Sequence, residues 1–488
     1  MTMPNNPRWI PAAEGGCLAI LLVWLAALPL PFGSIIESAR VPLIVVPISV
    51  CFVAALLRLY VIRDRMNSSH PTRAWLIWGI GALCFIAVGA LQLLPLPPRA
   101  LAAISPDSHA IWNAASHVAS LAGLTQGTSH PISIDPADTA VELFRVIALF
   151  ATFTAAALLV RTPGRRLAIT AVICAAASFE AWYGLREAAL QRYEIWGWVN
   201  RLIFNRVTGT FVNPNHFAHY MAIALPMALF IAAVAWHRTG GAPDIPLRRR
   251  LYLLLERELL WTAVSIGVAI VCVIAILLAQ SRGALLSLGA GILIVAAFLP
   301  GRRLARVAFG AFAGLILVAL LVAFLGTGRT VRRFVPSELD QKTLVGRRIG
   351  IEAGVRIWRR FPVLGSGLGT FHRAIYLEQR EDLGRSYHHA DNDYVEIAAT
   401  SGTAGYLIAV VALFGGYVAL LRMTFGRGAA ELSWGRRAFQ AAALTSLTIA
   451  MVHALVEHNF SVPSNPATLA AIVGAAVSVV DHDKRTRR

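Results

Sequence analysis

Long apolar runs alternate with short polar connections along most of the 488 residues. Each run approaches the roughly 20 residues that an α-helix needs to cross the hydrocarbon core of a bilayer. The pattern predicts an all-α polytopic membrane protein with about twelve transmembrane helices. Their expected positions are residues 15–33, 41–60, 75–97, 141–160, 167–187, 215–235, 260–279, 284–299, 307–326, 400–422, 438–456 and 463–480.

Every second connection between these runs is rich in arginine. Short loops with many positive residues stay on the cytoplasmic side of a membrane, so this side and both termini are predicted to be cytoplasmic. The basic connections are Arg58–Arg73, Arg161–Arg166, Arg248–Arg250, Arg302–Arg306, Arg427–Arg437 and the tail Lys484–Arg488.

The opposite side carries three larger segments, at 98–140, 188–214 and 327–399. We therefore divide the chain into spans one to nine (1–326), a large, partly helical periplasmic loop (327–399) and spans ten to twelve with the basic tail (400–488). The loop is rich in arginine, which suits either an anionic partner or a solvated helical surface.

The amino-acid composition also indicates a membrane protein, and the positions of the basic residues explain the net positive charge. Hydrophobic residues make up 57% of the chain and charged residues 14%, too apolar for a string of soluble domains. The net charge of +18 comes almost entirely from arginines between apolar runs, so topology explains it without a nucleic-acid partner. All five cysteines fall inside apolar runs, where they are typical of small core residues.

The densest polar stretch runs from Gly365 to Gly405 and is the expected place for chemistry. His388 and His389 lead into Asp391, and Asp393 with Glu396 is typical of a capping box at the start of a helix. The histidines would then lie just outside the bilayer at a fixed helix terminus. A surface histidine bonded to a neighbour is the structural alternative.

Two arginines are predicted to face the same side at tight turns beside spans. Arg206 lies in an Arg-Val-Thr-Gly-Thr-Phe-Val-Asn sequence, and Arg282 lies in Ser-Arg-Gly. Such an arginine either reaches the lipid headgroups or binds an anion, and a guanidinium fork matches phosphate oxygens.

The motifs in this polar stretch resemble those of the bacterial O-antigen ligases and the O-antigen or exopolysaccharide polymerases. They are Gly-Ser-Gly-Leu-Gly-Thr-Phe at 365–371, His-Ala-Asp-Asn-Asp-Tyr at 389–394 and Gly-Thr-Ala-Gly at 402–405. One position differs, because Asp391 stands where the family pattern has its second histidine.

The resemblance implies roles for these residues. Arg206 and Arg282 would hold the diphosphate of a lipid-linked donor, and His389 would act as general base on a sugar hydroxyl. Asp391 would either replace His389 as the base or orient its imidazole, and His388 is a third catalytic candidate. The sequence does not choose between His389 and Asp391.

Further candidates for substrate binding are Asn215, His216, Arg347, Arg348 and Asn392. Asp391 and Asp393 could hold a divalent ion, but the arginines can supply the same charge, so we expect no metal and no cofactor. Glu180 lies within an apolar run, where an ionisable residue either serves function or pairs with a neighbour such as Arg186.

The C-terminal stretch Val452–Pro466 resembles a segment of polymerase-like members and favours a polymerase. We expect inverting transfer of an undecaprenyl-diphosphate-linked glycan to an acceptor sugar hydroxyl on the periplasmic side of a bacterial inner membrane. The acceptor would be another lipid-linked repeat or, in a ligase, the lipid A core. The competing class is a transporter or flippase of lipid-linked sugars. Expected partners are membrane lipids and, as protein candidates, chain-length regulators or flippases.

Overall fold

The computed structural model describes residues 9–64, 72–124, 127–199, 206–238, 246–298, 338–378 and 387–478, and it is built almost entirely of helices. The helices of the first half are α1 (Trp9–Ala27), α2 (Glu37–Asp64), α3 (Arg73–Leu93), α4 (Pro98–Ile104), α5 (Pro106–Leu121), α6 (Pro136–Leu159), α7 (Pro163–Ala189) and α8 (Pro214–Arg238). Those of the second half are α9 (Leu247–Arg257), α10 (Leu259–Leu278), α11 (Arg282–Ala297), α14 (Glu338–Arg360), α15 (Phe371–Ala374), α16 (Asp393–Phe425), α17 (Trp434–His453) and α18 (Ser464–Ala476).

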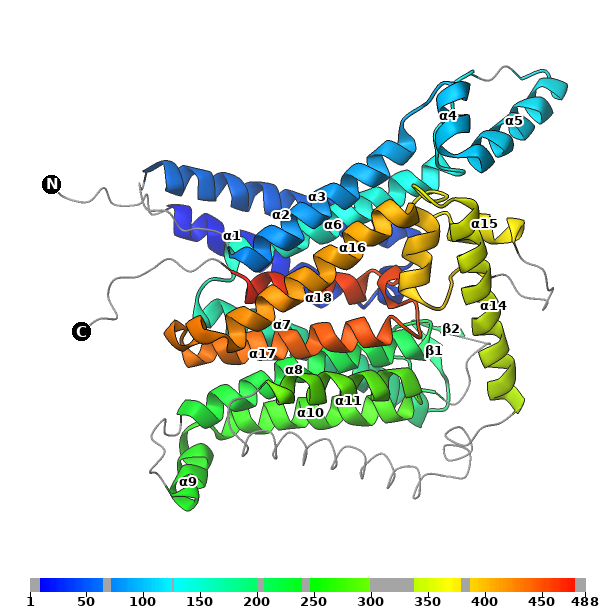
Figure 1. Ribbon diagram of the computed structural model, residues 1–488. Coiled ribbons are helices and arrows are strands. Elements are labelled where there is room, and N and C mark those ends of the chain that lie inside the picture. Colours follow the sequence, from blue (N-terminus) through cyan, green and yellow to red (C-terminus); the bar gives the residue numbers. More distant parts are fainter. Residues whose placement is uncertain are drawn as a thin grey trace.

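Most of the long helices lie side by side, and most of the smaller elements lie at one end of the bundle, while α9 lies at the opposite end (Figure 1). That end, which we call the site end, carries α4, α5, α14, α15 and the antiparallel hairpin of β1 (Glu194–Ile195) and β2 (Trp198–Val199). A short 3-10 turn, η4 (Asn459–Ser461), precedes α18. The predicted all-α architecture is therefore present in the described residues.

Eight helices of the described residues are long and apolar enough to cross a membrane: α1, α2, α3, α6, α7, α8, α10 and α16. Three more helices, α11, α17 and α18, overlap predicted spans, although α11 and α18 have only 16 and 13 residues. That is short of the roughly 20 residues that a bilayer requires. The predicted run at 307–326 lies outside the described residues, so the expected count of twelve stays a prediction.

Helix α16 begins where the sequence predicted, but through a different cap. Asn392 is the N-cap residue, and its side chain accepts a hydrogen bond from the Val395 amide at 3.0 Å. The predicted capping box is wrong, because the Asp393 amide donates to the Ala454 carbonyl at 3.0 Å and the Glu396 carboxylate bonds elsewhere. Glu396 is thereby available to the functional site.

The glycine motifs fit a break in α16. Gly402 has φ 66°, a backbone conformation that favours glycine, and it interrupts the helical hydrogen bonds. The segment 362–367 binds both sides of the break: the Thr403 amide donates to the Pro362 carbonyl at 2.8 Å, and the Gly367 amide donates to the Thr400 carbonyl at 3.1 Å. This contact fixes residues 362–367 against the bundle.

Buried polar contacts and ion pairs tie the outer segments together. Gln92, fully buried at the end of α3, donates to the Thr400 carbonyl at 2.8 Å and accepts from the Leu368 amide at 2.9 Å. On the surface, Arg360 of α14 contacts Asp107 of α5 at 2.7 Å. Several loop arginines have such carboxylate partners. For these arginines a solvated helical surface is a better interpretation than an anionic partner.

Candidate active site

A cavity of about 1250 Å³ opens among helices α2, α3, α6, α16 and α18 and reaches the site end. It exceeds the roughly 300–1,000 Å³ of ordinary small-ligand pockets. One part is lined by titratable side chains and the rest by apolar ones. The polar part holds His216, His372, His388, His389, His458, Asp138, Asp391, Asp393, Glu142, Glu396, Arg40 and Arg145.

His389 is held by a carboxylate in this polar part. Its Nδ1 lies 2.8 Å from Oε1 of Glu396, while Oε2 of Glu396 accepts from the Ala390 amide at 3.1 Å. Because an ionised carboxylate only accepts, Nδ1 of His389 carries the hydrogen of this bond. The expected alternative, in which Asp391 orients His389, is wrong: Glu396 is the partner, seven residues along the chain.

Asp391 instead bonds a second histidine, His458, which comes from the connection after α17. The distance between His458 Nδ1 and Asp391 Oδ1 is 2.9 Å, and the His458 ring stacks on His389 with centroids 4.4 Å apart. Burial by itself would lower the pKa of His458, but the hydrogen bond with Asp391 and the charges of Glu457, Asp391 and Glu396 raise it to about 9.

The same pair changes the chemistry of Asp391. Burial alone would raise the pKa of this carboxyl, but the hydrogen bond from His458 and the positive charges of His458 and Arg347 hold it below its ordinary value. A carboxylate with a depressed pKa is a weak base near neutral pH. Asp391 is therefore suited to hold His458 rather than to remove a proton.

A chain of polar contacts leads from this centre to Arg206. Glu457, 3% exposed, accepts from Arg347 at 2.7 Å and also accepts from the Asn215 side chain. The oxygen of the Asn215 amide accepts from Arg206 at 3.0 Å, and the Arg206 Nε donates to the Ala279 carbonyl at 2.8 Å. Arg206, Asn215 and Arg347 are thus brought together, and none of the three is among the described residues that line the cavity.

His216, Glu457 and His458 form one group whose ligand atoms lie within 4.8 Å of one another, close enough to hold a metal ion. Their protein partners oppose this. Glu457 is already neutralised by Arg347, and His458 is bonded to Asp391. A protonated imidazole has no lone pair for a metal, so the group is better described as a hydrogen-bond network.

The suggested metal pair of Asp391 and Asp393 is also occupied by protein groups. Asp393 is buried, and its carboxylate accepts from the backbone amides of Asn459 at 3.0 Å and Phe460 at 3.3 Å. These bonds fix η4, and with it His458, against the start of α16. Asp393 therefore builds the site structurally.

The remaining predicted residues lie in different places. His388 is exposed at the cavity rim, and the local burial with the neighbouring His389 and His372 lowers its pKa. Asn392 caps α16, and Arg348 is an exposed surface partner of Glu352 at 2.6 Å. Arg282 is exposed at the start of α11 and, among the described residues, does not line the cavity.

Glu180 supports the loop that follows Arg206. Its buried carboxylate accepts from the Thr210 amide at 2.7 Å and from the Thr210 hydroxyl at 2.8 Å. Arg186, the partner suggested for it, bonds Glu187 instead. Glu180 thus holds the Thr-Gly-Thr segment in place.

Sequence reasoning missed three groups of the site. Glu396 was assigned only to a cap, Glu457 and His458 lay unassigned in the stretch Val452–Pro466, and Arg145 lay inside an apolar run. An available signal was the intramembrane position of Arg145, since ionisable residues within spans are usually functional. The other was a cluster of polar residues between the last two apolar runs.

The described fold and site define an all-helical membrane protein with a large amphiphilic cavity and a histidine–carboxylate centre at one end. Residues 267–410 match the family model described as O-antigen ligase. This match supports the O-antigen ligase and polymerase superfamily and a glycosyltransferase type of enzyme. No curated protein matches the chain.

The matched stretch contains only half of the site. His389, Asp391, Glu396 and Arg347 fall within it, whereas His458 and the other groups from α6, α8 and the connection after α17 lie outside. The fold brings these groups to the same cavity.

Proposed function

We propose that the protein is a metal-independent inverting glycosyltransferase that polymerises undecaprenyl-diphosphate-linked repeat units on the periplasmic side of the inner membrane. The single observation that carries this proposal is the His389–Glu396 pair at the polar end of a large, mostly apolar cavity in a chain with an O-antigen ligase domain. A lipid-linked sugar needs both an apolar and a polar binding region, and the cavity offers both.

The proposed reaction begins with the acceptor sugar hydroxyl beside Nε2 of His389. Nε2 takes the hydroxyl proton as the oxygen attacks the anomeric carbon of the donor. The new carbon–oxygen bond forms on the side opposite the leaving group, which inverts the configuration, and the bond to the diphosphate breaks with its electron pair. Glu396 stabilises the resulting imidazolium through its bond to Nδ1.

His458 is proposed to place a positive charge beside the base. Its ring is bonded to the Asp391 carboxylate and stacks on the His389 ring with centroids 4.4 Å apart. Arg206 and Arg282 remain the arginines that the family resemblance assigns to the diphosphate. Arg206 has support from its polar connection to the centre through Asn215 and Glu457.

The test uses purified protein with lipid-linked repeat units as the only sugar substrate. A polymerase gives a ladder of products with increasing numbers of repeats. If the ladder is absent and a single transfer occurs after lipid A core oligosaccharide is added, the protein is a ligase, as the description of the matched family would suggest. If neither product forms, the glycosyltransferase proposal fails and a transporter of lipid-linked sugars becomes the better hypothesis.

A further inference from the structure

Three helices line the cavity with the same gradient from polar to apolar. Along α6, the lining residues pass from Asp138 and Glu142 through Arg145 to Leu149, Phe150 and Phe153. Along α16 they pass from Asp393 and Glu396 to Ala409, Ala412 and Leu413, and α18 continues from Ser461 of η4 to Leu469 and Val473. Since the three helices change character in the same direction, the cavity has one polar end and one apolar body.

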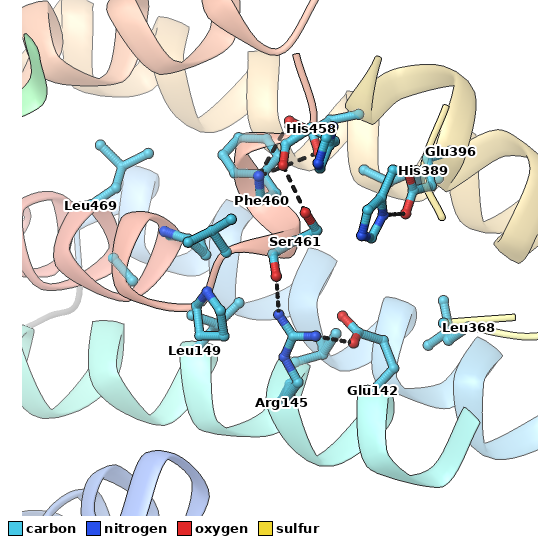
Figure 2. A pocket seen from close by; sticks show the side chains of 18 of the residues that line it. Glu142, Arg145, Leu149, Leu368, His389, Glu396, His458, Phe460, Ser461 and Leu469 are labelled. Carbon is cyan, nitrogen blue, oxygen red and sulfur yellow. Dashed lines mark hydrogen bonds and ion pairs between the residues drawn. The ribbon is translucent and has the colours of Figure 1, made fainter. Parts of the chain in front are cut away.

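Arg145 lies at the boundary between these two regions. Figure 2 shows Leu149 and Leu469 on one side of its guanidinium and Glu142, His389 and Glu396 on the other. Its side chain is 21% exposed and belongs to a helix that is apolar enough to span a membrane. A cation at this depth is costly unless it is paired, so its presence usually marks a functional site.

The protein partners of Arg145 leave part of the guanidinium for a ligand. Nη1 donates to Glu142 at 2.7 Å and Nη2 donates to the Ser461 carbonyl at 2.9 Å. An arginine has five N–H groups, and the bonds of Arg145 to described residues use two of them. The planar fork that remains matches two oxygens of a phosphate.

We propose that Arg145 binds the phosphate next to the lipid in the donor, with the prenyl chain along Leu149, Phe150 and Phe153 and the sugar toward His389. This assignment rests on the proposed function and fixes the orientation of its donor. The order lipid, phosphate, sugar follows the order apolar body, Arg145, polar end along α6. Arg206 and Arg282 do not line this cavity within the described residues, so Arg145 is a separate site from theirs.

The experiment measures binding of undecaprenyl diphosphate and of undecaprenol to the full-length protein in lipid nanodiscs. Wild type should prefer the diphosphate. Arg145→Gln should reduce diphosphate binding by about 10-fold to 100-fold, the value of a charge-assisted bidentate contact, and leave undecaprenol binding unchanged. Arg99→Gln, an exposed arginine of α4, is the matched control and should behave as wild type.

A second variant gives a signed test that does not depend on removing the cation. Glu142→Gln removes the carboxylate that shares the Arg145 charge, so diphosphate binding should become tighter. The Arg145 assignment is overturned if Glu142→Gln binds the diphosphate equally or more weakly than wild type does. It is also overturned if Arg145→Gln keeps the preference for the diphosphate. The product-ladder experiment tests the proposed function separately. If only Arg206→Gln loses the preference for undecaprenyl diphosphate over undecaprenol, the phosphate binds at Arg206. That result also overturns the Arg145 assignment. A wild type that does not distinguish the two lipids overturns the proposed donor itself.

Discussion

At the scale of single residues, the chemistry depends on which carboxylate bonds which imidazole. His389 bonds Glu396 and His458 bonds Asp391, and the two rings stack. The two imidazoles therefore differ in their carboxylate partners, and the bond to Asp391 goes with a raised pKa of the His458 ring. Pairs of titratable groups with different environments are a usual way to assign base and electrostatic roles.

The first prediction concerns the base. His389→Ala should lower turnover by about 100-fold to 10,000-fold while donor binding is kept, because the proton acceptor is lost. Glu396→Gln should lose a smaller part, on the order of 10-fold to 1,000-fold, since the imidazole is still present but poorly oriented. Product ladders at matched protein abundance measure both.

Asp391→Asn is the decisive comparison. It should be impaired less than His389→Ala, because Asp391 acts on His458 and not on the acceptor hydroxyl. An inactive Asp391→Asn enzyme together with an active His389→Ala enzyme would reverse the assignment of the base.

The second prediction concerns the diphosphate. Arg206→Lys and Arg282→Lys should each impair polymer formation severely although the charge is kept, because an ammonium cannot replace a bidentate fork. In Arg206→Lys the bond to Asn215 would also change. Near-normal product ladders from both variants at normal membrane abundance would contradict the role.

The third prediction follows from the pKa of His458. Because the folded-state pKa is raised to about 9, the charged ring stabilises the fold fully below its unfolded pKa of about 6.5, and this contribution is lost as the pH rises through about 9. The ionic part is on the order of 3 kcal/mol. The Tm difference between wild type and His458→Gln should therefore be large at pH 6 and smaller at pH 10. A difference that is constant with pH would mean that the fold does not raise the pKa of His458.

At the scale of elements, the site depends on the broken helix α16. The break lets residues 362–367 cross the helix while the turns before it present Glu396 to His389. A side chain at position 402 would leave no room for this crossing, because a Cβ at Gly402 would lie 2.4 Å from the Val363 carbonyl oxygen.

The fourth prediction tests this break. Gly402→Ala combines a steric overlap with a strained φ, so it should destabilise the protein by about 2–4 kcal/mol and reduce activity. Gly428→Ala is the control, because a Cβ there meets nothing within 4 Å. Comparison of Tm values in detergent measures the effect, and equal Tm values for the two variants would show that the backbone can relax.

At the scale of the whole molecule, the bundle joins an apolar cavity body to a polar end where positive groups are fixed by protein partners. Arg145 and His458 line the cavity and each has a carboxylate contact, so positive charge lies at two points along the path proposed for the donor. This distribution can stabilise a leaving diphosphate electrostatically.

The fifth prediction is that turnover survives removal of divalent ions. The fixed cations can supply the charge that a metal would supply, and the group of His216, Glu457 and His458 is already occupied by protein partners. The measurement compares product ladders with and without a chelator. Loss of turnover that magnesium or manganese restores would make this group a metal site.

The sequence by itself determined the features that depend on neighbouring residues. Apolar runs predicted the positions of the long helices, because the length and hydrophobicity of a span are local properties. The density of polar residues around His389 located one side of the site, and the start of α16 was predicted within one residue. The sequence did not predict which residue caps α16, because Glu396 bonds His389 rather than the backbone at the helix start.

Only the tertiary structure decided which groups share the cavity. His458 and Asp391 are 67 residues apart, Arg347 and Glu457 are 110 apart, and Arg145 and Ser461 are 316 apart. No local periodicity encodes such contacts, since they arise from how the helices pack and where their ends meet. The chain thus specifies locally which residues are candidates for chemistry, and the packing of the helices selects which of them face the same cavity.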